Sequence, residues 1–418
     1  MSADAALDHR GRPRVAVTGI GVKTPAGSDL ESFWSTLLAG RSRAARITRY
    51  DPADLPVRIG CEVGDFDPVP YLGAKESRRV DRTTQLGFAA AADALADAGD
   101  PDADPARCAV VAGTGVGGLM TVEEQVGIYL SRGTMRVTPF LVPMMMPNAT
   151  AATIGMQFGW TGPNLCVATA CAASAHAVGE AARLVRDGSA DVVMTGGNEA
   201  SMTPTAISAF SRMGALSARN DEPELASRPF DADRDGFVMG EGATFFVLER
   251  LDRARARGAR VYGEVAGYGR NADAYHITAP SPGGAGAAAC MQMALDDAGL
   301  AIGEIGHVNA HGTSTPLNDA AEAEAIRKVF GDTPPPVTST KGVTGHMVGA
   351  AGATEAAAVL LALRDGLVPP TANHERLGDD IGLDVVHGEA RPVAPRAAVS
   401  NSFGFGGHNA SLVLLPAS

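Results

Sequence analysis

The stretch from Leu165 to Ala200 reads LCVATACAASAHAVGEAARLVRDGSADVVMTGGNEA and indicates the fold more clearly than any other part of the chain. It predicts an apolar strand, a cysteine at a sharp junction, an Ala-rich helix that ends at Gly188, and a second strand. Because Cys171 lies where that helix begins, free backbone N–H groups and the positive end of the helix dipole would favour its thiolate. Cys171 is therefore either a poised nucleophile or a small buried apolar residue, as free cysteines often are.

Composition narrows the classes of protein to which the chain can belong. Its 418 residues include 50 glycines and are 45% hydrophobic but only 5% aromatic, which predicts two packed units with aliphatic cores. A formal net charge of −12 argues against nucleic acid or an anionic membrane as a general partner. Five scattered cysteines fit a reducing compartment without a metal cluster. The polar N-terminus is unlike a signal peptide, and no apolar run has the roughly 20 residues of a membrane span, so we expect a cytoplasmic protein.

Two segments of the first half each allow more than one structural or functional role. The segment AKESRRVD places Lys75, Arg78 and Arg79 on one helical face, which is an ordinary solvated charge run unless a partner is acidic. The Met- and Pro-rich segment Thr138–Asn148 is expected to be irregular and to line a pocket or an oligomer interface, or to belong to the core. The more regular elements predicted here are strands over Arg14–Gly21 and Cys108–Ala112, helices over Asp29–Ala39 and Thr83–Gly99, and a turn over Gly113–Gly118.

The second half of the sequence repeats the first. ALADAG at 94–99 returns as ALDDAG at 294–299, and each is followed by a Gly-Thr turn, AGT at Ala112 and HGT at His311. AHAVGEAARLVRDG then corresponds to ATEAAAVLLALRDG, and GFVMGEGATFFVLER to SFGFGGHNASLVLL. Four matches in the same order predict gene-duplicated halves, residues 1–255 and 256–418, each an α/β unit with helices on both faces of its sheet.

The repeat gives Cys171 two partners. His346 lies near the start of the helix that matches the one behind Cys171, and His311 occupies the turn position that Ala112 holds in the first half. A pseudo-twofold axis would bring these strand ends and helix starts to a common centre. We therefore expect one cysteine from the first half and two histidines from the second to share a site.

Four blocks of the sequence resemble the β-ketoacyl-acyl-carrier-protein synthases, specifically their elongating type II group. They are VATACAASAHAVGEA, NAHGTSTPLNDAAEAEAI, STKGVTGHMVGAAGATEA and SNSFGFGGHNASL, and the resemblance covers nearly the whole chain. It implies the thiolase fold, which is a duplicated five-layered α-β-α-β-α arrangement, usually in a homodimer. It also implies an acyltransferase that needs no cofactor or metal of its own, because its substrates arrive on the phosphopantetheine of acyl carrier protein.

The resemblance also implies roles for individual residues. Cys171 matches the acyl-accepting nucleophile, and His311 and His346 match the two histidines of a Cys-His-His triad. Lys341 matches the lysine beside the second histidine, and Glu355 matches the carboxylate of the same network. Phe405 matches the gate, and its N–H forms an oxyanion hole with that of Cys171. Thr313 and Thr315 match the residues that bind the pantetheine arm, and the acyl pocket is matched by Val116, Phe403 and Leu141, of which Leu141 reaches across the dimer. The residues that match the carrier-docking surface are Lys75, Arg78 and Arg79. Ala310 and His408 depart from the pattern, since many relatives have threonine at both positions.

Several alternatives share part of this pattern. The catalytic ketosynthase of a type II polyketide or polyene pathway has the same triad and would permit a heterodimer. A non-catalytic partner subunit that sets chain length would lack the nucleophile, whereas Cys171 is present. A thiolase would need a second cysteine near the C-terminus, but Cys290 is the last one. A cysteine hydrolase that used Cys171 and Asn401 would leave Lys341 and the second histidine unexplained.

Overall fold

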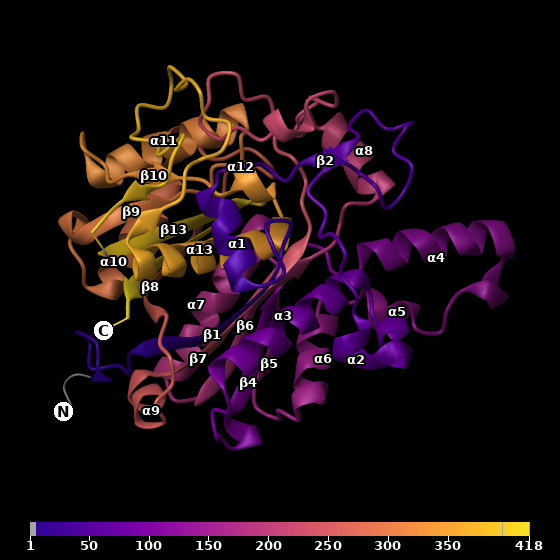
Figure 1. Cartoon of the computed structure of the whole chain (residues 1–418), viewed down its shortest axis with the longest axis horizontal. Helices are drawn as coiled ribbons and strands as arrows, with labels where there is room; N and C mark the ends of the chain where they lie inside the picture. Colours follow the sequence, from indigo (N-terminus) through magenta and orange to yellow (C-terminus); the bar gives the residue numbers. More distant parts are fainter. Residues whose placement is uncertain (1–5, 395, 418) are drawn as a thin grey trace.

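The structure is a computed structural model that describes residues 6–394 and 396–417. Its centre is a large sheet with the strand order β10-β9-β13-β14-β8-β1-β7-β6-β4-β5 (Figure 1). The strands of the N-terminal half are β1 (Val15–Lys23), β4 (Cys108–Gly113), β5 (Asn164–Val167), β6 (Val192–Glu199) and β7 (Gly242–Arg250). Those of the C-terminal half are β8 (Gly263–Ala272), β9 (Ile305–Asn309), β10 (Val337–Thr338), β13 (Ala397–Gly404) and β14 (His408–Pro416).

The strand order is symmetric about the junction of β1 with β8. Outward from this junction, β1, β7, β6, β4 and β5 correspond to β8, β14, β13, β9 and β10. The two halves of the sheet are joined by a short antiparallel pairing of Ala16 and Val17 with Glu264 and Gly263. The internal repeat therefore appears in the structure as two sets of five strands related by a pseudo-twofold axis.

The two five-stranded halves of the sheet form two of the five layers, and helices form the other three. The helices α7 (Ala173–Arg186) and α13 (Ala351–Asp365) pack on each other and on strands of both halves, so they form the middle layer. The helix α3 (Arg82–Ala98) covers β1, β6 and β7 on one outer face, and α10 (Ala285–Ala298) covers β8, β13 and β14 on the other. A helix that is apolar on all sides must be buried, and α13 is buried from Ala351 to Leu363. The predicted five-layered α/β fold is confirmed.

Further helices and two small sheets complete the described chain. The remaining helices are α1 (Leu30–Leu38), α2 (Val69–Glu76), α4 (Leu119–Arg132), α5 (Leu141–Met145), α6 (Ala149–Phe158), α8 (Pro204–Arg212), α9 (Leu251–Ala256), α11 (Pro316–Phe330) and α12 (Lys341–Thr344). Two small sheets pair β2 (Ala45–Arg46) with β3 (Ile59–Gly60) and β11 (Leu367–Val368) with β12 (Arg391–Pro392). Over the described residues, no helix combines the length and the hydropathy that a membrane crossing requires.

Two local expectations were wrong. The segment Thr138–Asn148 is not wholly irregular, because its centre forms α5, which packs on α4 and α6. The three basic residues do not share the face of one helix. Lys75 lies in the last turn of α2, whose backbone is broken at Gly73 with φ 74°, whereas Arg78 and Arg79 lie in a following 3₁₀ turn, Ser77–Arg79. The tighter turn rotates the side chains away from the 3.6-residue period.

Candidate active site

Cys171 lies in a sharp connection between β5 and α7. A 3₁₀ turn, Ala170–Ala172, precedes α7, and Ala170 has a left-handed backbone with φ 49°. A non-glycine residue in this region is strained, and such strain is commonly found where a side chain must be aimed at a site. The second half has the equivalent turn at Val348–Ala350, where Val348 has φ 45°. This correspondence makes Gly349 the structural counterpart of Cys171.

The two histidines reach Cys171 from loops of the second half. His311 follows the end of β9, and its backbone N–H donates to the buried carboxylate of Glu322 over 2.8 Å. His346 lies near the start of α13, as the sequence predicted. It lies in the loop between α12 and the turn at Val348–Ala350, because its backbone N–H donates to Val238 and its carbonyl accepts from Gly240.

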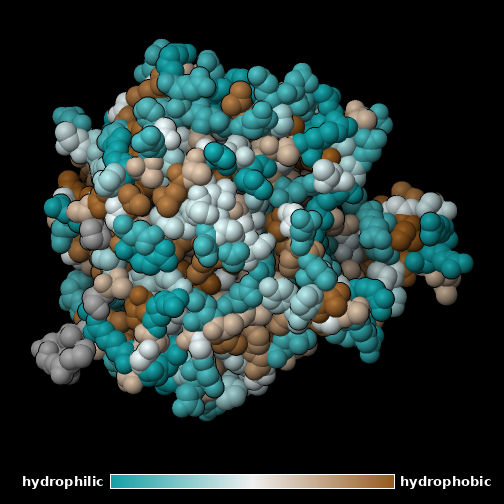
Figure 2. Space-filling view, in the orientation of Figure 1, coloured by the Kyte–Doolittle hydropathy of each residue, from teal (hydrophilic) through white to brown (hydrophobic). Residues whose placement is uncertain are grey.

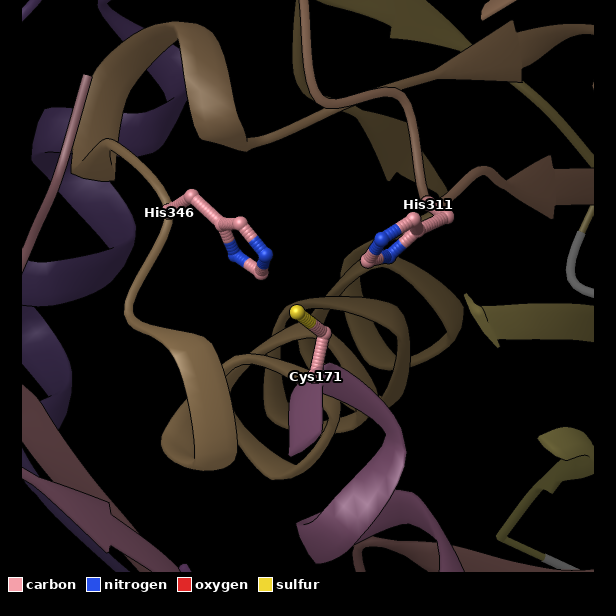
Figure 3. Close-up of side chains that lie close together, drawn as sticks. All are labelled: Cys171, His311 and His346. Carbon is pink, nitrogen blue, oxygen red and sulfur yellow. The ribbon is translucent and has the colours of Figure 1, made fainter. Parts of the chain in front are cut away.

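The three side chains converge as the sequence repeat predicted (Figure 3). The Cys171 sulfur and one nitrogen of each imidazole all lie within 4.8 Å of one another. The ring centroids of His311 and His346 are 5.3 Å apart and the rings are nearly perpendicular, at 84°. A substrate carbonyl bound above the sulfur could therefore meet N–H groups from two directions.

Burial, and to a lesser extent a neighbouring cation, determines the protonation state of both histidines. The Nζ of Lys341 donates to the carbonyl of His311 over 2.6 Å, lies 3.4 Å from its Nδ1, and forms an ion pair with Glu355. Burial lowers the pKa of His311 and of His346 well below the ordinary value, and the charge of Lys341 lowers both further. Both imidazoles are therefore neutral at physiological pH, and each can donate one N–H and accept one proton.

The resting state of Cys171 differs from the expectation based on the helix dipole. Burial raises the pKa of the Cys171 thiol to about 11, although Lys341 and the backbone N–H groups of Phe405 and Cys171 oppose this rise. The desolvation of a thiolate therefore outweighs the favourable N–H groups. Cys171 is a thiol at rest, and its proton must be removed during attack.

The loop Gly404–Gly407, which we call the gate loop, lies directly against the nucleophile. The backbone N–H groups of Phe405 and Cys171 both favour the thiolate of Cys171 by hydrogen bonding, so they lie close enough to the sulfur to reach an oxygen on a carbon bonded to it. A side chain on Gly404 would come within 2.7 Å of the Thr169 oxygen and 3.2 Å of the Cys171 nitrogen. Glycine is required here by this close approach rather than by a positive φ.

A cavity of about 510 Å³ connects this centre with the surface. It is lined by Val116 and Phe403, and by Thr313 and Thr315, whose hydroxyls lie 2.9 Å apart. Phe405 also lines it, and its ring lies 6.4 Å from that of Phe210. Leu141, at the start of α5, does not line this cavity within the described chain.

The three basic residues of the predicted docking surface lie apart from this cavity, and they differ in exposure and in ion pairing. Lys75 and Arg78 are exposed. Arg79 is half-buried, forms a 2.9 Å ion pair with Glu76, and stacks over the ring of Phe140 at 4.9 Å. Lys75 and Arg78 are therefore the two cations with the most freedom to meet an acidic partner.

Two residues that support the site had not been expected. Glu322 accepts the N–H groups of both His311 and Gly312, and Phe237 packs edge-on against His346 with centroids 5.3 Å apart. A signal for Glu322 exists in the sequence, because Asp319, Glu322 and Ile326 fall on one face of α11 and all three are buried. A carboxylate on an apolar helix face must have hydrogen-bond partners, and here they are the N–H groups that fix His311.

The same cluster has the donors of a soft metal site. One sulfur and two imidazole nitrogens match the ligands that Zn²⁺ prefers. The Nζ of Lys341, 3.4 Å from His311 Nδ1, is a poor neighbour for a second cation. The geometry suits proton transfer and N–H donation better than metal binding.

Comparison with known proteins places this geometry in a family. The model of the β-ketoacyl synthase N-terminal domain matches residues 12–254, and that of the C-terminal domain matches residues 262–375. The chain is 46% identical over 407 residues to 3-oxoacyl-[acyl-carrier-protein] synthase 2 of Synechocystis sp., with 96% of this chain and 97% of that protein covered.

Solved structures show the same likeness. The ishigamide ketosynthase/chain length factor superposes with a TM-score of 0.92 at 37% identity, over 97% of this chain and all of that one. The AntDE:AntF complex, a type II PKS acyl-carrier protein with its ketosynthase, superposes with a TM-score of 0.87 at 29% identity and with the same coverage. Together with the duplicated sheet and the convergence of Cys171, His311 and His346, these matches show that the chain belongs to the β-ketoacyl synthase family.

Proposed function

We propose that this protein is an elongating 3-oxoacyl-acyl-carrier-protein synthase that lengthens an acyl chain by two carbons. The observation that carries the proposal is the convergence of one thiol, two neutral imidazoles and two backbone N–H groups in the lining of one open cavity. The similarity to 3-oxoacyl-[acyl-carrier-protein] synthase 2 supports the fatty-acid substrate class, because the 46% identity there exceeds the 29% identity to the ketosynthase of the type II PKS complex.

Acyl transfer to Cys171 is the first step. The sulfur attacks the thioester carbonyl of an acyl carrier protein while a neutral imidazole within 4.8 Å accepts the thiol proton. The N–H groups of Phe405 and Cys171 stabilise the oxyanion of the tetrahedral intermediate. The carrier thiolate leaves and takes the proton, because an imidazole with so low a pKa holds it only briefly.

Condensation is the second step. Malonyl carrier protein loses carbon dioxide, and the N–H groups of His311 and His346 stabilise the negative charge that develops on the thioester oxygen. The carbanion attacks the acyl carbon on Cys171 and the carbon–sulfur bond breaks, which leaves a thiolate. This thiolate takes a proton from water that enters the open cavity, since the original thiol proton left with the first carrier. None of these steps needs a cofactor of the enzyme, because the carrier's phosphopantetheine brings both substrates and Thr313 and Thr315 can bind that arm along the cavity.

We also propose that the enzyme is a homodimer and that it acts in the cytoplasm. The edge strand β5 has an exposed Leu165. An arm that includes α4 and α5 projects from the body of the molecule (Figure 1), and its visible face has hydrophobic residues among hydrophilic ones (Figure 2). A second copy is the natural cover for such a surface. In this arrangement residues 1–255 supply the nucleophile, residues 256–418 supply both histidines, and Leu141 contributes to the pocket of the partner subunit.

Intact-mass analysis tests the chemistry directly. The enzyme is mixed with acyl carrier proteins that carry chains of different length, and the mass gained by the enzyme is recorded. We expect one acyl group per chain on the wild type and none on Cys171→Ala. Acylation that persists in this variant would rule the proposal out. A strong preference for β-keto or polyene chains over saturated ones would instead assign the enzyme to a polyketide pathway.

A further inference from the structure

The imidazole of His176, on the buried side of α7, joins two segments that meet at the active site. Its Nδ1 lies 2.7 Å from the hydroxyl oxygen of Thr169, and its Nε2 lies 3.2 Å from the backbone oxygen of Asn409. Thr169 comes two residues before Cys171, and Asn409 comes two residues after the end of the gate loop. One side chain therefore connects the strained turn of the nucleophile with the strand that carries the gate.

The two contacts fix the tautomer of His176. A carbonyl oxygen only accepts hydrogen bonds, so Nε2 must carry the proton and donate to Asn409. In the neutral ring Nδ1 then accepts from the Thr169 hydroxyl. Burial lowers the pKa of His176 to about 4, helped by the nearby His408 and Arg270 and opposed by the hydrogen bond to Asn409. The ring is thus a neutral donor and acceptor throughout the physiological pH range, and the link it forms is permanent.

The gate loop is held on its other side as well. The side-chain amide of Asn409 donates to Asp273 over 2.7 Å and to Asn271 over 2.9 Å, and the N–H of Asp273 donates to Gly407 over 2.9 Å. At the start of the loop, Gly404 lies directly against the carbonyl of Thr169. Because Thr169 and Asn409 flank the nucleophile and the gate, a change in their separation moves the N–H of Phe405 relative to that of Cys171.

We infer that His176 is a positioning residue that holds the gate loop in register with the nucleophile, so that the N–H groups of Phe405 and Cys171 converge on one oxygen. The inference rests on the proposed function, since it assigns those N–H groups to the acyl oxyanion. The oxyanion hole and the pair of active-site histidines are then held by separate sets of contacts. The oxyanion hole depends on His176, whereas His311 and His346 are held by Glu322, Lys341 and the loop at Val238–Gly240.

The test compares acyl transfer with malonyl decarboxylation in the same variants. For His176→Ala we expect the rate of acylation of Cys171 to fall between about 10-fold and 100-fold, as for a misaligned oxyanion donor. Decarboxylation of malonyl carrier protein should stay near the wild-type rate. His176→Gln should recover much of the acylation rate, because a carboxamide offers one donor to Asn409 and one acceptor to Thr169.

A matched control is His307, which is also buried and bonded to a threonine, with its Nε2 2.9 Å from Thr338 Oγ1, but which lies in β9 away from the gate. His307→Gln should leave acylation unchanged. Equal loss of acylation and decarboxylation in both His176 variants, with a lowered melting temperature, would show a merely structural role and overturn the inference. Wild-type acylation in His176→Ala would also overturn it. Failure of the proposed function itself is seen separately, as acylation that does not require Cys171.

Discussion

At the scale of single residues, the site works with neutral groups in a buried setting. Burial raises the pKa of Cys171 to about 11 and lowers the pKa of both active-site histidines. Thiol and imidazole are thus each present in the uncharged form, which suits proton exchange between them and leaves the N–H groups free for carbonyl oxygens. Burial is the main cause of the neutral state of the histidines, and the charge of Lys341 reinforces it.

The two steps of the reaction should depend on different residues, acylation on Cys171 and decarboxylation on both histidines. We expect His311→Ala and His346→Ala to be acylated still, because either variant keeps one imidazole near the sulfur that can accept its proton. Each should lose decarboxylation of malonyl carrier protein by about 100-fold or more, since one N–H donor to the developing enolate is missing. Mass spectrometry measures the first step and release of labelled carbon dioxide the second. Loss of acylation in either single variant would contradict this division.

The raised pKa of Cys171 predicts a pH dependence. A thiol reacts as its thiolate, and the thiolate fraction of a group with pKa about 11 rises as pH rises. Alkylation of Cys171 by iodoacetamide should therefore become about tenfold faster for each pH unit between pH 6 and pH 9. Peptide mass spectrometry, with Cys171→Ala as the control, distinguishes this thiol from the other cysteines. A rate that is flat above pH 7 would mean that Cys171 is already ionised at rest.

At the scale of elements, two tight connections decide the geometry of the site. The turn before α7 has left-handed backbone at Ala170, and its counterpart in the second half repeats this at Val348. The gate loop approaches the first of these turns so closely that its first residue has no room for a side chain. Strain in the turn and lack of space in the loop together aim Cys171 and Phe405 at the same point.

Adding one methyl group to this connection tests its importance. In Gly404→Ala the new carbon would lie 2.7 Å from the Thr169 oxygen, so the gate loop must move away from the nucleophile. We expect acylation to slow by about 10-fold to 100-fold, because the Phe405 N–H then leaves the oxyanion position. Gly303→Ala is the control, since nothing lies within 4 Å of its added carbon. Equal acylation rates for the two variants would show that the loop tolerates displacement.

The same elements show what the sequence could and could not predict. The repeat predicted that Cys171, His311 and His346 would meet, because equivalent turns of duplicated halves must approach one axis. The repeat did not show what holds His346, since its backbone hydrogen bonds join it to Val238 and Gly240 in a distant segment. The position of Cys171 at a helix start led to too high an expected fraction of thiolate, because desolvation depends on the surrounding packing rather than on local residues.

At the scale of the whole molecule, a protein of net charge −12 must use local charge to attract an acidic carrier. Lys75 and Arg78 are exposed, whereas Arg79 already pairs with Glu76. Lys75→Glu with Arg78→Glu should therefore raise the KM for acyl carrier protein and weaken its salt dependence, with kcat nearly unchanged. Arg260→Glu, an exposed change beside α9, is the control. An unchanged KM at low salt in the double variant would place the docking surface elsewhere.

The two ends of the sheet differ in a way that the pseudo-twofold axis does not explain. At one end, backbone groups of Asp384 and Val386 exchange hydrogen bonds with Val337 and cover β10. At the other end β5 has no neighbour beyond β4 within the described chain, and Leu165 is 49% exposed. We expect pairing of this edge with a second copy about a twofold axis to form the dimer.

Leu165→Lys should therefore shift the wild-type dimer to monomers, because it buries a charge at the centre of the proposed interface. Sedimentation velocity measures the change, and acylation should fall with it if Leu141 contributes to the partner's pocket. Ile302→Lys is the matched control, since Ile302 is 46% exposed but lies in a turn next to β9. A wild type that sediments as a monomer, or a Leu165→Lys variant that remains a dimer, would exclude this edge as the interface.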